Sequence, residues 1–244
     1  MTDPIALTDP IALTDAIALC AHGEAAWHGA AYASLGAGWA DDGRLGRATG
    51  GVPHRLLFGA VTLAPDATVP QQVPGIVCDS FARLLLPGRQ AEPAGYWMIR
   101  SGAARAGLPE VRGLRVRRAE TDDDVAWFEY LAFLAADGEL PATSGELQPP
   151  GTQRLPGVTL LVAEIDGEGV GTALSMVTGR VNNLGAVAVM PAYRGRGIGS
   201  LLTEAAVAVA PGLPATLSAT PAGRGVYARL GFAQVGRPLH HHPA

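Results

Sequence analysis

The sequence predicts an α/β protein with a smaller N-terminal α+β module, and three observations support this. Short apolar segments are punctuated by Gly and Pro, as in strands joined by turns. After Thr121, apolar residues recur at helical spacing at Val125, Phe128 and Leu131. In the C-terminal half, an apolar segment ending at Val189 leads through a glycine-rich loop into an Ala- and Leu-rich segment, which indicates strand, loop and helix.

Composition excludes several classes of protein. Of 244 residues, 48% are hydrophobic and 16% are charged, which argues against disorder of the whole chain. A net charge of −4 argues against broad capture of nucleic acid or of an anionic membrane. All 18 basic residues are arginine, which excludes a Schiff-base lysine and a P-loop lysine. Cys20 and Cys78 indicate neither a disulfide framework nor a metal site.

The N-terminal half carries no chemical motif. Residues 1–13 hold most of a Thr-Asp-Pro-Ile-Ala-Leu repeat and are expected to form a flexible extension, with Thr14 as N-cap of a helix near 15–34. No secretory signal pattern is visible at the start, so we expect a cytoplasmic protein. We expect an accessory module over 14–104. Its expected strands are Arg55–Leu63, Gly75–Leu86 and Tyr96–Arg100.

After a Gly/Ala/Pro-rich linker from Ser101 to Glu110, the pattern is sharper. Leu114 and Val116 alternate with arginines, which is typical of a half-buried strand. Thr121 precedes three aspartates, which predicts an N-cap followed by acids that suit a helix N-terminus. Segments Thr159–Ile165 and Val170–Val177 flank a Gly-rich turn and predict a β-hairpin.

The loop at 194–200 is the candidate binding site. Gly195, Gly197 and Gly199 let the main chain approach a ligand closely and adopt positive φ. A helix that begins after such a loop presents free N–H groups to an anion, and Arg194 and Arg196 add positive charge. The predicted ligand is a pyrophosphate.

Three other interpretations compete with a pyrophosphate site. A Rossmann loop needs G-x-G-x-x-G, but the third glycine here comes one residue early, and too little chain follows for the rest of that fold. A Walker loop needs lysine, which the chain lacks. A plain glycine-rich connection remains the main rival, but it would leave the two interleaved arginines without a purpose.

The segment Val187–Leu202 resembles the acyl-CoA signature of the GNAT N-acetyltransferase family, whose Arg-x-x-Gly-x-Gly pattern falls on Arg194, Gly197 and Gly199. Tyr227-Ala228-Arg229-Leu230-Gly231-Phe232 resembles the family's later Tyr-x-x-Leu-Gly-Phe motif. The resemblance covers about 112–237 and implies a mixed, mostly antiparallel sheet flanked by helices. Residues 238–244, with three histidines, are then expected to form a solvated tail. The N-terminal module could be a degenerate copy of the same fold.

The resemblance implies transfer of an acetyl group from acetyl-CoA to a primary amine of a small molecule or protein, with no metal. The residues expected to bind the coenzyme are Val187, Ala188, Val189, Arg194, Gly195, Arg196, Gly197, Ile198, Gly199 and Ser200. Tyr227 matches the family tyrosine that protonates the departing thiolate; the alternative is a core aromatic. The fourth strand carries Asn182 and Asn183 where many relatives have a carboxylate, so the base is either water or a carboxylate elsewhere, such as Glu164 or Glu129.

The resemblance leaves several questions open. In relatives, the first helices recognise the amine, which points here to the aromatic residues from Trp127 to Phe133 and the loop Pro141–Gly157. Helical spacing makes most of these aromatics core residues first. Thr220 replaces a family asparagine, which puts one coenzyme contact in doubt. The rival functions are a non-catalytic acyl-CoA-binding or regulatory protein and an interaction module without coenzyme. We expect neither a nucleic-acid nor a membrane partner, and a homodimer stays open.

Overall fold

The computed structural model describes residues 10–103, 107–108, 110–137 and 143–243. The described chain forms two compact units. The first contains the chain up to Arg100 together with the residues from Thr216 onward, and the second contains Ser101 to Ala215. These units differ from the expected linear division into 14–104 and 112–237, because the C-terminal strands pair with strands of the N-terminal part.

Helix α1 (Pro10–Ser34) begins earlier than the sequence predicts. Pro10 occupies the first helical position, where no N–H is needed and the fixed φ suits a helix. Leu13 and Ile17 pack against the buried core, so burial favours helix there. The predicted extension is therefore wrong for residues 10–13, and Thr14 lies inside the helix rather than at its N-cap. Residues 1–9 lie outside the described chain.

The first unit contains a six-stranded sheet in the order β1-β2-β3-β4-β13-β5. Neighbouring strands are antiparallel except β3 and β4, which are parallel. The bounds are β1 (Trp39–Asp41), β2 (Leu45–Ala48), β3 (Phe58–Thr62), β4 (Ile76–Asp79), β5 (Arg89–Pro93) and β13 (Leu239–Pro243). The strands expected around β3 and β4 are confirmed within narrower bounds. The short β1 and β2 lie in a Gly-rich stretch that gave no strand signal.

The expected C-terminal tail is wrong for Leu239–Pro243, which form β13. This strand lies between β4 and β5 and pairs with both, so it is an interior strand of the sheet. His241 is buried on it, and its backbone carbonyl accepts a hydrogen bond from Arg89 Nη1 at 3.3 Å. Three consecutive histidines carry no apolar alternation, and tertiary pairing rather than local pattern makes this segment a strand.

Three more strands of the first unit follow the order β12-β6-β11, namely β12 (Ala233–Gly236), β6 (Tyr96–Arg100) and β11 (Ala215–Ala219), of which only Ala215 belongs to the second unit. Strand β12 pairs antiparallel with β6. Helix α4 (Arg224–Arg229) precedes β12. The strand predicted at Tyr96–Arg100 is confirmed.

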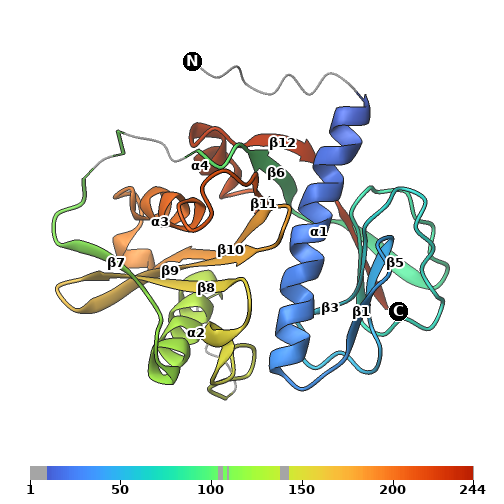
Figure 1. Cartoon of the computed structure of the whole chain (residues 1–244), viewed down its shortest axis with the longest axis horizontal. Coiled ribbons are helices and arrows are strands. Elements are labelled where there is room, and N and C mark those ends of the chain that lie inside the picture. The colour runs from blue at the N-terminus through green and yellow to red at the C-terminus, as the bar shows by residue number, and fades with distance from the viewer. Residues whose placement is uncertain (1–9, 104–106, 109, 138–142, 244) are drawn as a thin grey trace. The chain divides into compact units, whose positions relative to one another are not determined.

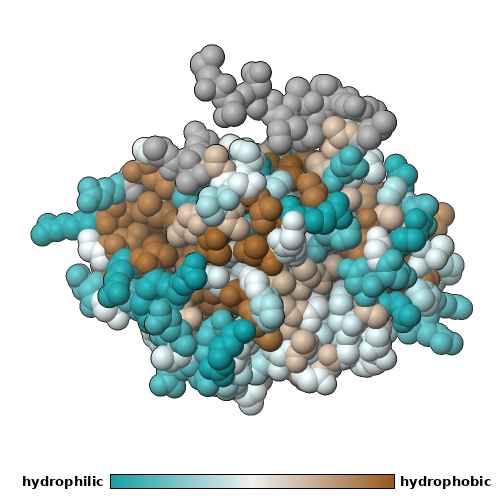
Figure 2. All heavy atoms as spheres, in the orientation of Figure 1, coloured by the Kyte–Doolittle hydropathy of each residue, from teal (hydrophilic) through white to brown (hydrophobic). Residues whose placement is uncertain are grey.

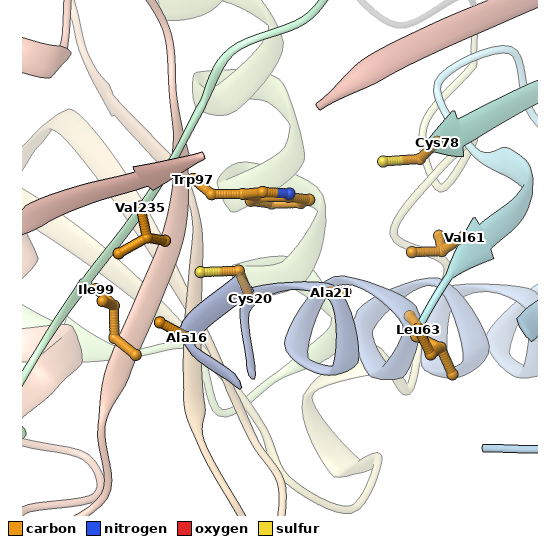
Figure 3. Close-up of a cluster of buried hydrophobic side chains, with 10 residues drawn as sticks. Ala16, Cys20, Ala21, Val61, Leu63, Cys78, Trp97, Ile99 and Val235 are labelled. Atoms are coloured by element: carbon orange, nitrogen blue, oxygen red, sulfur yellow. The ribbon is translucent and has the colours of Figure 1, made fainter. Parts of the chain in front are cut away.

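A buried cluster joins α1 to strands of the first unit (Figure 3). Cys20 on α1 lies in this cluster with Trp97 on β6, Cys78 on β4 and Val235 on β12. The Trp97 indole Nε1 donates to the carbonyl oxygen of Ser80 at 3.2 Å, which satisfies the buried donor. Burial raises the pKa of both cysteine thiols, so both stay protonated and unreactive at neutral pH.

The second unit holds four strands in the order β10-β9-β8-β7, all antiparallel. They are β7 (Leu114–Arg118), β8 (Val158–Ile165), β9 (Glu168–Val177) and β10 (Asn182–Val189). The predicted hairpin is confirmed: Asp166 and Gly167 join β8 to β9 with φ of 52° and 83°, as in a two-residue hairpin turn. The sheets of the two units are thus mixed and mostly antiparallel, as the sequence predicts.

Helices α2 (Asp122–Asp137) and α3 (Ile198–Val207) pack on opposite faces of this ladder (Figure 1). The predicted cap of α2 is present, because the Asp124 N–H donates to Thr121 Oγ1 at 3.1 Å and the Thr121 N–H donates back to Asp124 Oδ2 at 3.0 Å. Short 3-10 turns η1 (Thr152–Arg154) and η2 (Pro191–Tyr193) complete the unit. No helix in the described chain is long and apolar enough to span a bilayer.

Removal of β13 should unfold the first unit. We expect a chain ending at Arg237 to lose on the order of 3 kcal/mol or more of unfolding free energy, because β5 would lose its neighbour in the sheet and β4 would lose one of its two. Urea unfolding followed by Trp fluorescence measures this loss. A chain ending at Pro243 keeps all of β13 and is the control. Equal stability of the two truncated chains would contradict an interior role for β13.

His28 should make stability depend on pH. Burial lowers the pKa of His28 to about 4, against about 6.5 in an unfolded chain. The unfolded state therefore takes up the proton first, so the His28 contribution is fully present above pH 6.5 and falls by up to about 3 kcal/mol as the pH drops to 4. Burial also lowers the pKa of His240 to about 4, which adds a fall of similar size, so His28→Phe should remove about half of the total fall. Urea titrations at pH 7, 5.5 and 4.5 test this, and an unchanged pH dependence in His28→Phe would contradict it.

Candidate functional site

The candidate site begins at an irregularity in β10. Gly185 pairs with Leu174 and Ala188 with Thr172, so β10 has one residue more than β9 between these pairs. This is a β-bulge, and Ala186 within it has a φ of 48°, which is unusual for a residue other than glycine. The Thr172 hydroxyl donates to the Ala186 carbonyl oxygen at 2.8 Å and stabilises the bulge. The expected coenzyme contacts Val187, Ala188 and Val189 follow it and are half-buried.

A tight turn connects β10 to the glycine loop. The Met190 N–H donates to the Val170 carbonyl oxygen at 2.9 Å, and η2 follows at once. The Arg194 N–H donates to the Pro191 carbonyl oxygen at 3.3 Å, while Arg194 Nε donates to the Val189 carbonyl oxygen at 3.0 Å. The Arg194 main chain and side chain thus both hold the turn together.

The following amides are free. Within the described chain, no acceptor is found for the backbone N–H groups of residues 195–199. Gly197 is the N-cap of α3 in the left-handed region, with φ 86° and ψ −3°, and no side chain caps the helix. The Ser200 and Leu201 N–H groups both donate to the Gly197 carbonyl oxygen, at 3.0 and 3.1 Å. Five consecutive N–H groups at a helix N-terminus suit an anionic ligand.

Helix α3 is fixed behind this loop. Ile198 and Leu202 are fully buried, and the helix packs on β8, β9 and β10. At its other end, the buried Asn182 donates Nδ2 to the Ala206 carbonyl oxygen at 2.8 Å and accepts a hydrogen bond from the Ser175 hydroxyl at 2.7 Å. On the face drawn in Figure 2, hydrophobic residues gather over the region where Figure 1 places α3. The N-terminus of α3 is thus held by packing along the helix body.

The two loop arginines are exposed but have different surroundings. The Arg196 guanidinium carbon lies 5.1 Å from the centroid of the Tyr193 ring, and Arg196 Nη2 donates to the Ala192 carbonyl oxygen at 3.1 Å. Residues 182–203 contain no Asp or Glu, so the strand end, loop and helix start carry net positive charge. This charge adds to the positive end of the helix dipole.

Tyr193 and Glu168 belong to this arrangement, although the sequence analysis did not single them out. The Tyr193 hydroxyl donates to Glu168 Oε2 at 2.7 Å, and this hydrogen bond raises the pKa of Tyr193. Glu168 is the first residue of β9, in a hairpin distant in sequence from the loop. No local pattern signals such a pair, because only the packing of the sheet brings the hairpin to the turn.

Tyr227, the predicted proton donor, lies on α4 in the first unit. Its ring is half-buried and contacts Phe232 edge to face, with ring centroids 5.9 Å apart. Burial raises the pKa of Tyr227 to about 12, so the phenol is neutral over the physiological range. Within its own unit, the phenol oxygen has no hydrogen-bond partner among the described residues.

The two carboxylates considered as general bases are held by structural contacts. Glu129 is buried on α2 and accepts hydrogen bonds from the N–H groups of Gly145, Leu147 and Gln148 at 2.6 to 2.9 Å. Glu164 forms an ion pair with Arg117 at 2.7 Å. Glu129 thus holds the 143–148 loop to the helix, and Glu164 links two strands.

The remaining residues that the sequence suggested for the site are partly structural and partly exposed. Asn182 and Asn183 are both buried, and Asn182 is structural. Phe128 and Phe133 are core residues, whereas Trp127 and Tyr130 are partly exposed and stack with centroids 5.2 Å apart. Pro141 and Ala142 of the predicted acceptor loop lie outside the described residues. Across the described chain, no three His, Cys, Asp or Glu side chains gather as a metal site.

Comparisons with known proteins match the domain and the fold that contain this loop. Residues 156–234 match the family model of the acetyltransferase (GNAT) domain. No curated protein matches the sequence. Three solved structures resemble this fold over most of the chain, with sequence identities that support the fold alone.

The first of these structures is a GCN5-related N-acetyltransferase from Kribbella flavida, with a TM-score of 0.58 and 18% identity over 90% of this chain and 95% of that chain. A functionally unknown conserved protein from Staphylococcus epidermidis has a TM-score of 0.58 and 13% identity over 85% and 93%. A GNAT-family protein from Novosphingobium aromaticivorans has a TM-score of 0.52 and 21% identity over 86% and 94%. The chain thus carries a domain of the GNAT acetyltransferase family, which the family model matches at residues 156–234.

Proposed function

We propose that this protein transfers an acetyl group from acetyl-CoA to a primary amine. The observation that carries the proposal is the row of five free N–H groups at residues 195–199, beside the exposed guanidinium of Arg196. A diphosphate offers several anionic oxygens close together, and hydrogen bonds from main-chain N–H groups and an arginine match them. An internally capped helix start would have argued against a diphosphate ligand.

The residues of the second unit fit an extended acyl-CoA arm. Beyond the bulge at Ala186, the half-buried residues Val187 to Val189 lead directly to the free amides. We infer that their main chain bonds the pantetheine arm as a strand would, while residues 195–199 and Arg196 hold the diphosphate. Ser200 contributes less than predicted, because its N–H already donates to Gly197.

In the proposed reaction, acetyl-CoA supplies an acetyl group activated as a thioester. The amine nitrogen forms a bond to the carbonyl carbon, the C–S bond breaks, and the sulfur takes up a proton. We assign that proton to Tyr227, whose raised pKa keeps it protonated and able to donate. A main-chain N–H of β10 near the bulge is the candidate donor to the carbonyl oxygen.

Water is the proposed acceptor of the amine proton. Glu129 receives three main-chain hydrogen bonds and Glu164 is paired with Arg117, so neither carboxylate is available as a base. β10 carries two buried asparagines instead of a carboxylate. We therefore expect activity to rise with pH as the acceptor amine itself loses its proton.

The test of the proposed function is release of CoA thiol from acetyl-CoA across a panel of primary amines, from small polyamines to lysine-containing peptides. A thiol reagent reports CoA cleanly, because Cys20 and Cys78 are both buried. Release that depends on one class of amine, with the acetylated product identified by mass, supports the proposal. Binding of CoA without release on every amine would contradict catalysis, and absence of CoA binding would contradict the coenzyme site.

Gly197→Ala should weaken CoA binding. Its φ of 86° is costly for a residue with a Cβ, by roughly 1–2 kcal/mol, so the loop should relax and the row of amides should lose its alignment. We expect CoA affinity to fall about tenfold, measured by calorimetry. Gly212→Ala is the matched control, since Gly212 has a φ of 100° outside the loop. Equal CoA affinity in the two variants would contradict the role of the loop.

Tyr227→Phe should lower kcat tenfold or more and leave the KM for acetyl-CoA unchanged, because it removes a proton donor and keeps the ring. Since the pKa of Tyr227 is about 12, wild-type kcat should show no loss between pH 7 and 10 from titration of this phenol. Tyr96→Phe, on β6, is the control, because it also removes a phenol and keeps the ring that Arg224 contacts. A kcat equal to that of wild type would remove Tyr227 from the mechanism.

A further inference from the structure

The Arg196 side chain is held by Tyr193 and, through it, by Glu168, which lie outside the Arg-x-x-Gly-x-Gly pattern. Its guanidinium stands over the Tyr193 ring at 5.1 Å, and the Tyr193 hydroxyl donates to the Glu168 carboxylate at 2.7 Å. Three residues from two segments thus form one column: Glu168 from the start of β9, Tyr193 from η2 and Arg196 from the glycine loop. Each contact orients the next group in the column.

The column leaves most of the guanidinium available for a ligand. Among the described residues, the partners of Arg196 are the Ala192 carbonyl oxygen and the Tyr193 ring, and five N–H donors are present on the group. Arg194 differs, because its Nε donates to Val189 and its main chain closes the turn. Both arginines are exposed, and Arg196 is the one whose guanidinium is held against an aromatic ring.

Orientation matters because an exposed arginine otherwise loses side-chain entropy when it binds. A guanidinium already held against an aromatic ring has lost part of that freedom before the ligand binds. The entropy lost on binding is therefore smaller, and the affinity is higher. The Glu168 carboxylate accepts a hydrogen bond from the Tyr193 hydroxyl and so fixes the orientation of the ring. Without this role in orienting Tyr193, the Glu168 carboxylate near an anion-binding loop would only repel the ligand.

We propose that Glu168 and Tyr193 are positioning residues that hold Arg196 ready for the phosphate groups of the coenzyme. This inference rests on the proposed function, because it takes the anion at residues 195–199 to be acyl-CoA. Glu168 acts through Tyr193, and Tyr193 acts through Arg196. Neither Glu168 nor Tyr193 needs to touch the coenzyme.

The test measures the dissociation constant of CoA by calorimetry for the full chain and its variants. We expect Arg196→Met to weaken binding about tenfold, as loss of one charged hydrogen-bond donor to phosphate would. Tyr193→Ala should weaken it about two- to fivefold, in the range of a cation–π contact at an exposed site. Glu168→Ala should weaken it about twofold, while Glu168→Gln keeps an acceptor for the phenol and should stay near wild type.

A double-mutant cycle separates positioning from a purely structural role. In an Arg196→Met background, Tyr193→Ala should cause no further loss of CoA affinity, because the group it orients is gone. A full additional loss in that background would overturn the proposal. Tightening of CoA binding in both Glu168→Ala and Glu168→Gln would also overturn it, since Glu168 would then act only as a repelling charge.

The salt dependence of CoA binding and a control variant give two further measurements. The loss caused by Arg196→Met should shrink when NaCl rises from 50 to 500 mM, as for a screened charge contact. Tyr96→Phe, on β6, should bind CoA like wild type. Failure of wild type to bind CoA would refute the proposed function itself, whereas wild-type binding with unaltered Tyr193 and Glu168 variants would refute only this inference.

Discussion

Five backbone N–H groups that find no acceptor among the described residues are the feature on which the proposed function of this protein depends. Residues 195–199 run from the turn after β10 into the first turn of α3, and their N–H groups donate to no acceptor in the described part of the chain. Unpaired N–H groups are tolerated where water or a ligand satisfies them, and a helix dipole makes an anion the favoured ligand. The residue types in the loop add positive charge and no carboxylate.

Such a loop is useful only if its surroundings hold it still. The bulge at Ala186 is bonded by Thr172, the turn is closed by Arg194, and α3 is bound at its far end by Asn182. These contacts are made by buried or internally satisfied groups, so they do not compete with the ligand. In the second unit, hydrogen bonds therefore fix the segments on both sides of the loop, while the loop N–H groups stay open to a ligand. A preorganised binding site has this arrangement.

The first unit is stabilised differently. Its core is formed by α1 against strands that come from both ends of the chain, and its sheet is completed by β13. This sheet is therefore complete only when the C-terminal residues pair with strands of the N-terminal part. Bringing such distant segments together costs loop-closure entropy before their hydrogen bonds can form. Buried histidines such as His28 add a dependence on acidity that the second unit's binding loop, with no histidine, does not share.

The sequence by itself determined the local elements around the loop, because each carries its own signal: the hairpin turn at Asp166-Gly167, the Thr121 cap and the glycines before α3. Only the tertiary structure decided the remaining features. Helix α1 starts at Pro10 because burial of Leu13 outweighs local preference, and the histidine-rich terminus becomes a strand because β4 and β5 pair with it. Glu168 meets Tyr193 for the same reason, since contacts between distant segments depend on packing, which no short sequence pattern encodes.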